Sequence, residues 1–252
     1  MKKILFMAAA AALVFMSCKK DDSVEIDTGN GATRLLKKIT KTQNGETTVY
    51  NFTYDANNRL TSYKSTDDRE QLIFTYDGAN IIKVEETEDN FKNIYTYAYN
   101  NNVPVSGTFK SWQKHAGEPD ELIEDDILTY TLENDQVTNI HLNMTQYGVE
   151  ADFKLSYTNG NLSKVESTSG YAFSAAFTYG NKKAPFPKLS KYVLDQAGFS
   201  IQFFAKNELL SAAYDFPGTE LDKTLVTQYT YDAAGFPLTS NDGETLLKFE
   251  YL

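Results

Sequence analysis

The chain has 252 residues, which is enough for one large β domain or two small ones. Tyrosine (17) and phenylalanine (16) are abundant, and aromatic side chains suit the half-buried surface of a β-sheet. The net charge of −10 argues against a nucleic-acid partner, and the single cysteine excludes an intrachain disulfide and a cysteine-based zinc site.

Residues 1–17 have the anatomy of a secretory signal peptide. Two lysines precede an apolar stretch, 4–16, which is shorter than the ~20 residues of a transmembrane helix. The only cysteine, Cys18, follows the small residue Ser17 where cleavage would fall. This order resembles a bacterial lipoprotein signal, although Phe15 stands where leucine is more common. We predict that Cys18 is lipidated; the alternative is a plain secretory signal with an incidental cysteine.

Residues 18–31 are predicted to form a flexible tether that carries the lipid. Two basic and two acidic residues follow the cysteine: Lys19, Lys20, Asp21 and Asp22. This run resembles the surface-export signal of Bacteroidota-type lipoproteins, and the resemblance implies an outer-membrane lipoprotein displayed at the cell surface. The same composition also suits a merely solvated tether.

From 32 to 252 the chain repeats one unit: an alternating strand, a short polar turn and a second alternating strand. In 49–55, Tyr50, Phe52 and Tyr54 share one face, which is the period-two pattern of a half-buried strand. Related units recur about every 20–30 residues, and several turn at Asn-Gly or Asp-rich stretches. The pattern predicts an all-β fold in which one up-and-down antiparallel meander of roughly 16 strands closes, or rolls strongly, into a barrel.

The insertion 111–126 is predicted to be the longest loop of this domain. Loops on a rigid β scaffold often carry binding residues. We therefore expect Trp112 to be a stacking platform for a ligand, with His115 and Asp120 orienting polar groups. The alternative is that Trp112 only anchors the loop to the barrel rim.

The same insertion contains six acidic residues, which could either hold calcium or be solvated. Their spacing does not match an EF-hand loop, so we predict no metal site. The six are Glu118, Asp120, Glu121, Glu124, Asp125 and Asp126.

One segment interrupts the alternation after residue 184. Apolar residues recur at helical spacing there, and Pro187 and Gly198 suit the two boundaries of a helix. We predict a short helix near 186–197 that could cap or plug the barrel, with a strand as the alternative.

Two features of the repeat domain carry a resemblance to a known family. They are a Pro-containing break after a Tyr-rich strand and the repeated Tyr-Asp hairpins at Tyr54-Asp55, Tyr76-Asp77 and Tyr231-Asp232. In these features residues 32–252 resemble a Bacteroidota lipoprotein family of unknown function with a porin-like fold. The Tyr-Asp element is also similar to the YD repeats of Rhs-type toxins, although only Arg59-Leu60 fits their fuller consensus. The resemblance implies a porin-like barrel and brings no known activity.

The alternation would also fit a transmembrane barrel. Spanning strands need about 9–11 residues with an apolar lipid face, whereas most runs here are shorter. In 59–65 both faces carry polar side chains. We therefore expect the aromatic face to line the interior of a water-soluble barrel, with the Cys18 lipid as its only membrane attachment.

The sequence shows no nucleophile elbow, zinc-protease motif or nucleotide-binding loop, and it has only two histidines, His115 and His141. We expect no cofactor. The most economical function is a noncatalytic binding or interaction module for a glycan, a small molecule or a surface protein. The alternative is a surface carbohydrate-active hydrolase that uses a carboxylate pair, whose geometry is invisible in sequence. A pair facing across a cleft would favour the hydrolase, and a lumen filled by side chains would favour a structural module.

Overall fold

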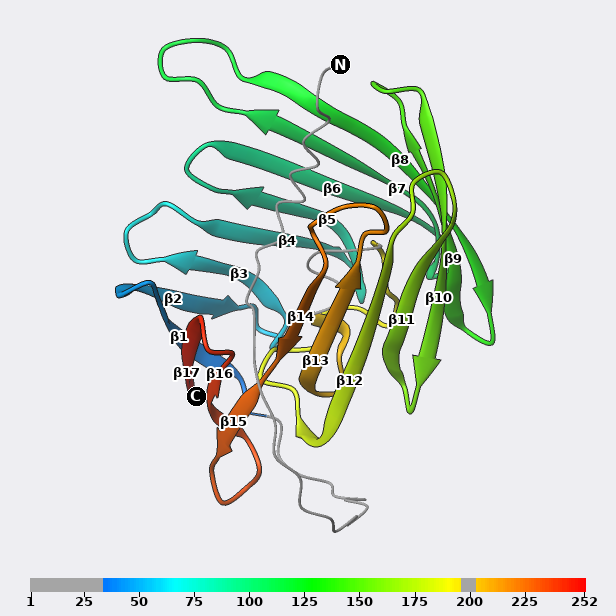
Figure 1. Cartoon of the computed structure of the whole chain (residues 1–252). Coiled ribbons are helices and arrows are strands. Elements are labelled where there is room, and N and C mark those ends of the chain that lie inside the picture. The colour runs from blue at the N-terminus through cyan, green and yellow to red at the C-terminus, as the bar shows by residue number, and fades with distance from the viewer. Residues whose placement is uncertain (1–33, 196–202) are drawn as a thin grey trace.

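The computed structural model describes residues 34–195 and 203–252, which form one antiparallel β-sheet rolled into a nearly closed barrel (Figure 1). The predicted signal peptide, tether and lipidated cysteine lie outside the described residues. The strands are β1 (Leu36–Gln43), β2 (Glu46–Tyr54), β3 (Leu60–Ser65), β4 (Gln71–Asp77), β5 (Asn80–Thr87), β6 (Phe91–Asn100), β7 (Val103–Gln113), β8 (Glu121–Glu133), β9 (Gln136–Met144), β10 (Val149–Thr158), β11 (Asn161–Ser169), β12 (Ser174–Lys183), β13 (Asn207–Asp215), β14 (Lys223–Val226), β15 (Gln228–Tyr231), β16 (Pro237–Asn241) and β17 (Thr245–Tyr251).

The strands follow one another around the barrel in chain order, and β1 pairs with β17 to bring the two ends of the sheet together. Ile39 illustrates the closure, because its register partners are Tyr50 in β2 and Phe249 in β17, and all three are buried. Among the described strands, only β14 and β15 are consecutive without a ladder between them. They are two parts of one run: β14 pairs with β13, β15 pairs with β16, and the Thr227 amide between them donates to the Leu210 carbonyl at 2.7 Å. Counted as one, they give the predicted meander of roughly 16 strands.

The barrel interior is filled by the segment that interrupts the repeat. We call residues 184–195 and 203–206, between β12 and β13, the plug. Its aromatic rings contact different strands of the barrel wall. The ring centroid of Phe203 lies 5.7 Å from that of Phe74 in β4, and the ring centroid of Phe186 lies 6.2 Å from that of Phe249 in β17. The Tyr130 hydroxyl of β8 also donates to the Leu194 carbonyl at 2.8 Å.

The predicted helix near 186–197 is wrong for residues 186–195, which have no helical backbone; the last two positions are not described. The Leu189 amide donates instead to the Phe203 carbonyl at 2.9 Å, on the other arm of the plug. Tyr192, Val193 and Leu194 are consecutive and all buried, so the segment is enclosed on every side. The helical spacing reflected burial all round rather than one apolar helix face. No helix of the described chain is long and apolar enough to cross a membrane.

A tyrosine recurs near the end of every second strand. The contacts of these tyrosines explain why the hairpin unit recurs in the sequence. Because the meander runs up and down, these tyrosines lie at one end of the barrel, here called the tyrosine rim. Six of their hydroxyls donate to a backbone carbonyl at or near the start of the strand before, at 2.7–3.2 Å. The pairs are Tyr54–Leu36, Tyr76–Leu60, Tyr99–Ile81, Tyr157–Val137, Tyr229–Leu209 and Tyr251–Pro237. Each ring packs against the core while its polar tip satisfies a main-chain acceptor.

The aspartate of the Tyr-Asp pair organises the turn that follows. The Asp55 carboxylate accepts the amides of Asn57 and Arg59, both at 2.9 Å. Asp232 repeats this arrangement with Ala234 and Phe236, at 2.8 and 2.9 Å. The recurring dipeptide therefore ties neighbouring hairpins together with one residue and shapes the rim turn with the next.

Candidate functional site

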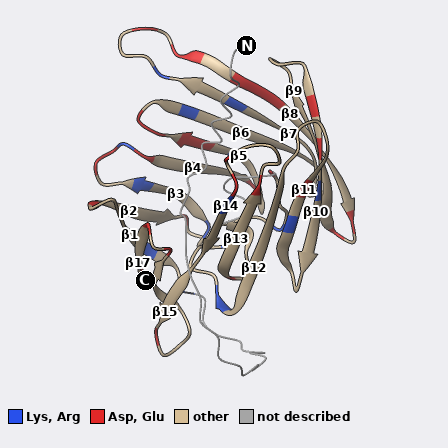
Figure 2. Cartoon of the chain, in the orientation of Figure 1, with Lys and Arg blue, Asp and Glu red and all other residues tan. Residues whose placement is uncertain are grey.

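The predicted binding loop 111–126 is mostly strand. β7 extends to Gln113 and β8 begins at Glu121, so only residues 114–120 connect them. The loop prediction failed because the two strands of this hairpin are among the longest in the sheet. Figure 2 shows that acidic residues gather near the start of β8.

Trp112 lies within β7, where its register partners are Leu122 in β8 and Lys92 in β6. His115 and the exposed Asp120 lie in the connection, and the His115 Nε2 atom is 3.4 Å from Glu121 Oε2. No hydrogen bond or ring contact joins these three predicted site residues to one another within the described chain. Their role in ligand binding stays a prediction.

A row of polar side chains crosses the interior wall from β5 to β8, nearer the end opposite the tyrosine rim. Asn93 donates to Glu86 Oε2 at 2.9 Å, and Ser111 donates to Asn93 Oδ1 at 2.7 Å. These three are buried, and the register places Glu124 beside Ser111 as the next member. Cross-strand pairing thus puts one polar group from each of four strands into the barrel.

The carboxyl groups of this row have raised pKa values. Burial raises the pKa of Glu86 to about 7, and the nearby acids Glu88, Asp195 and Glu70 add to the effect. Burial and the neighbouring Glu124 raise the pKa of Asp126 to about 8, and burial raises that of Glu124 as well. Desolvation disfavours the ionised form, so burial shifts Asp126 toward its protonated form.

Among the described carboxylates, Glu124 and Asp126 are the best candidates for the carboxylate pair of a hydrolase. They lie two residues apart on one strand, and the Glu124 carboxylate helps to raise the pKa of Asp126. Glycoside hydrolases instead hold their two carboxyl groups about 5–9.5 Å apart, with the substrate between them. The pair therefore resembles two acids sharing a proton more than an acid and a base that flank a sugar. Across the described residues, no three His, Cys, Asp or Glu side chains converge to hold a metal ion.

The alternation pattern held a signal for these buried acids that the sequence prediction missed. Asp126 is in phase with the buried Leu128, and Glu86 is in phase with the buried Val84. Side chains two positions apart on a strand point to the same face of the sheet. A carboxyl in phase with an apolar core residue is a candidate interior acid even when it lies in an acidic run.

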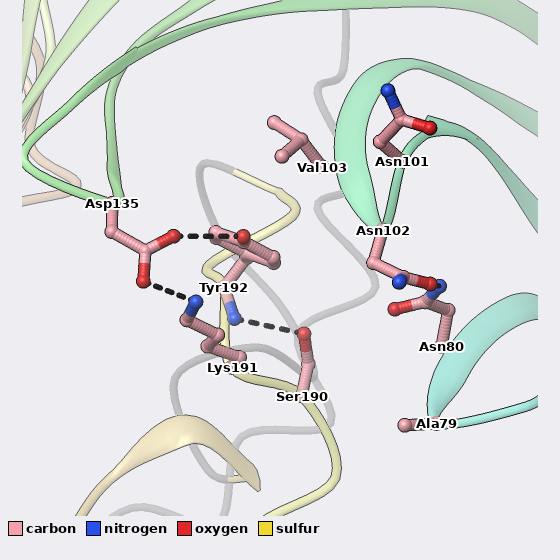
Figure 3. A pocket seen from close by; sticks show the side chains of 9 residues that line it. All are labelled: Ala79, Asn80, Asn101, Asn102, Val103, Asp135, Ser190, Lys191 and Tyr192. Carbon is pink, nitrogen blue, oxygen red and sulfur yellow. Dashed lines mark hydrogen bonds and ion pairs between the residues drawn. The ribbon is translucent and has the colours of Figure 1, made fainter.

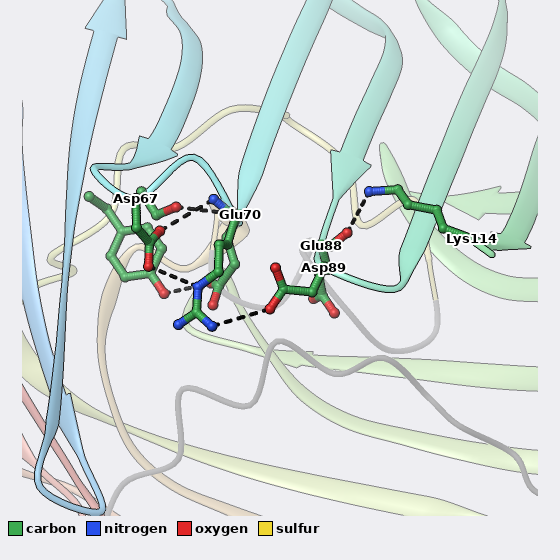
Figure 4. A network of polar contacts seen from close by, with 8 residues as sticks. Asp67, Glu70, Glu88, Asp89 and Lys114 are labelled. Atoms are coloured by element: carbon green, nitrogen blue, oxygen red, sulfur yellow. Dashed lines mark hydrogen bonds and ion pairs between the residues drawn. The ribbon is translucent and has the colours of Figure 1, made fainter. Parts of the chain in front are cut away.

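Polar contacts join three adjacent turns at the end of the barrel nearest this row (Figure 4). Arg69 contacts Asp67 at 3.0 Å in its own turn and Asp89 at 3.3 Å in the next turn. The Lys114 ammonium, from the β7–β8 connection, donates to the Glu88 carbonyl at 2.6 Å. Exposed ion pairs such as these contribute little stability individually. They do link the three turns at this end of the barrel, opposite the tyrosine rim, through their side chains.

The tyrosine rim carries a hollow of about 470 Å³ between three tight turns and the plug (Figure 3). One wall comes from the β4–β5 and β6–β7 turns, where Asn80 donates to Asn102 Oδ1 at 2.8 Å. The facing wall is Asp135 of the β8–β9 turn, which accepts the Tyr192 hydroxyl at 3.0 Å and pairs with the Lys191 ammonium of the plug. The hydrogen bond from Lys191, followed by that from Tyr192, lowers the pKa of Asp135.

The barrel resembles a solved structure described as a porin-like protein from Bacteroides vulgatus ATCC 8482. The TM-score is 0.57 at 15% sequence identity, and the match covers 87% of this chain and 99% of the other. A second structure, described as TcdB2-TccC3-TEV, matches with a TM-score of 0.18 at 12% identity over 77% of this chain and 13% of the other, which is too low to carry an argument. No protein-family model matches the sequence, and no curated protein matches it. The predicted porin-like barrel is confirmed as a fold, while membership of the lipoprotein family and kinship to YD repeats stay predictions.

Proposed function

We propose that the protein is an outer-membrane lipoprotein whose barrel is a noncatalytic binding or interaction module, displayed at the cell surface in the aqueous phase. The observation that carries this proposal is the filled interior. Phe186, Leu194 and Phe203 of the plug are at most 8% exposed, so the lumen is packed with the chain's own side chains. A packed lumen favours recognition on the rims and the outer surface over transport or chemistry inside.

Charge pairs on the outer face support an aqueous setting. Lys83 and Glu85 flank the inward-facing Val84 on β5, and their charged groups are 3.0 Å apart. Lys110 of β7 and Asp125 of β8 form a similar pair at 2.7 Å. A lysine facing lipid near the bilayer midplane costs about 2–4 kcal/mol, whereas water solvates it freely. Attachment through a lipid on Cys18 is consistent with such a surface.

Membrane fractionation of cells that make the full chain tests the anchor. Cys18→Ala should move the protein from the membrane fraction to the soluble fraction, whereas replacing the tether residue Ser23 by Ala should leave it in the membrane fraction. Replacing Asp21 and Asp22 by Ala should lower protease accessibility on whole cells while the protein stays membrane-bound. A Cys18→Ala chain that remains in the membrane fraction would refute the lipid anchor.

A surface hydrolase is the second candidate, because Glu124 and Asp126 are neighbouring carboxyl groups with raised pKa values. Raised carboxyl pKa values are a feature of catalytic acids. Release of reducing ends from neutral polysaccharides distinguishes the two functions. The module is expected to release none, whereas release that Glu124→Gln and Asp126→Asn both abolish would establish the hydrolase.

A further inference from the structure

The hollow at the tyrosine rim has polar groups that the fold leaves available. The Asn80 Nδ2 atom donates a hydrogen bond to Asn102 Oδ1. Within the described residues, the remaining atoms of the two amides, Asn80 Oδ1 and Asn102 Nδ2, form no hydrogen bond. This pair therefore presents one acceptor and one amide donor side by side. Asn101 adds a second amide from the same turn (Figure 3). Adjacent amide donors and acceptors match the paired hydroxyl groups of a sugar.

The hollow is electrically balanced in a protein of net charge −10. Its lining includes one carboxylate, Asp135, and one ammonium group, Lys191, and these two form an ion pair. An anion would compete with Asp135 for Lys191, and a cation would compete with Lys191 for Asp135. The balance favours an uncharged ligand over either ion.

An apolar edge completes the lining. Val103, 37% exposed, and Ala79 lie on the same wall as the amides (Figure 3). Tyr192 is only 5% exposed, so it holds Asp135 in place rather than offering its ring face. Amides beside a small apolar surface suit the mixed hydroxyl and C–H faces of a pyranose ring. The volume of about 470 Å³ is within the ~300–1,000 Å³ typical of small-molecule sites.

The lining is held before any ligand arrives. Asn101, Asn102 and Asp135 have left-handed backbone conformations, with φ of 50°, 63° and 63°, which tight two-residue hairpin turns require. Because the flanking ladders fix these turns, little conformational entropy remains to be lost on binding. We propose that this hollow is a binding site for uncharged sugars, an inference that rests on the proposed binding-module function and names its ligand class.

Binding of the full-length chain, purified in detergent, to immobilised polysaccharides tests the proposal. The neutral probes are mannan, xylan, β-glucan and galactan, and the acidic probes are polygalacturonate and heparin. We expect at least one neutral probe to bind. Asn80→Ala and Asn102→Gly should each weaken that binding at least tenfold with an unchanged melting temperature, because glycine accepts the left-handed conformation at position 102.

Asn44→Gly is the matched control. Asn44 has a φ of 52° in the β1–β2 turn, at the opposite end of the barrel, and this variant should bind like the wild type. Binding of acidic probes alone, or of no probe, would overturn the ligand class. Neutral binding that survives both hollow variants would overturn this site but leave the binding module standing. Release of reducing ends would instead refute the noncatalytic function itself.

Discussion

Glu86 shows how single residues make this interior sensitive to pH. The residue is 6% exposed and its carboxyl group accepts a hydrogen bond from Asn93, while Glu70, Glu88 and Asp195 lie near enough to raise its pKa further. In the unfolded chain a glutamate has a pKa of about 4.3. In the folded chain the value is about 7, so folding favours the protonated form.

The sign of the resulting pH dependence follows from linkage. A carboxyl whose pKa is raised by folding contributes its full stability below about pH 4.3, and this contribution is lost as the pH rises toward 7. Wild-type protein should therefore have a higher melting temperature at pH 5 than at pH 8. Glu86→Gln cannot ionise, so it should be more stable than wild type at pH 8 by about 1–3 kcal/mol, and the difference should vanish near pH 4.

Urea unfolding at several pH values measures this difference. Glu85→Gln is the control, because Glu85 is the next residue along β5 but lies on the outer face beside Lys83. This variant should keep the wild-type pH dependence. If Glu86→Gln unfolds as wild type does at every pH, the carboxyl of Glu86 is not buried as the structure has it.

At the scale of the hairpin, the recurring tyrosine joins one unit to the next, and two tyrosines at equivalent positions separate its hydrogen bond from its ring. The Tyr76 hydroxyl donates to the Leu60 carbonyl at 2.7 Å, whereas the Tyr179 hydroxyl is buried without a partner in the described chain. Tyr76→Phe should lower the free energy of unfolding by about 1 kcal/mol because it orphans a carbonyl. Tyr179→Phe should be neutral or slightly stabilising, because it removes an unsatisfied hydroxyl. Equal losses in urea unfolding would show that the rim bonds do not stabilise the hairpins.

Packing between a strand and the plug gives a second prediction at this scale. Phe74 of β4 is 3% exposed, and its ring lies edge-on to Phe203 of the plug. Phe74→Ala should lower the free energy of unfolding by about 3 kcal/mol or more, because it leaves a cavity between wall and plug. Thr53→Ala, on the outer face of β2, should cost less than about 1 kcal/mol. A small loss for Phe74→Ala would mean that wall and plug are not packed together.

Outside 111–126, the sequence was sufficient to predict most of the strands and turns because both are local. Alternation marks a strand, and Asn-Gly or Asp-rich stretches mark its turn. The rim bonds could not be predicted, because each joins a tyrosine to a carbonyl 14–20 positions away whose proximity depends on strand register. The hollow could not be predicted for the same reason, since Asn102, Asp135 and the plug line one hollow only in the rolled sheet. The plug was misread because an irregular segment buried on all sides can imitate helical spacing.

For the whole molecule, the sequence intervals between the tyrosines of the tyrosine rim reflect both the repeating strands of the barrel and the plug inside it. Tyr54 and Tyr76 are 22 positions apart, and Tyr229 and Tyr251 are also 22 apart, whereas Tyr179 and Tyr229 are 50 apart. The long interval contains the plug, so the described part of the inserted segment, 184–195 and 203–206, lies inside the barrel instead of forming an external loop. A closed sheet avoids exposed edges, and the plug supplies the apolar contacts that a sheet of this width cannot make across its own lumen.

Accessibility of the plug to a bulky thiol reagent tests the filled barrel most directly, because Cys18 is the only cysteine. In a Cys18→Ala background, Val193→Cys places one thiol in the plug, where Val193 is 0% exposed. Val105→Cys is the matched control on the outer face, where Val105 is 44% exposed. With a polyethylene-glycol maleimide in native buffer, the thiol at 105 should react fully, and the thiol at 193 should react only after unfolding in urea. Native labelling at 193 as fast as at 105 would mean that the lumen is open.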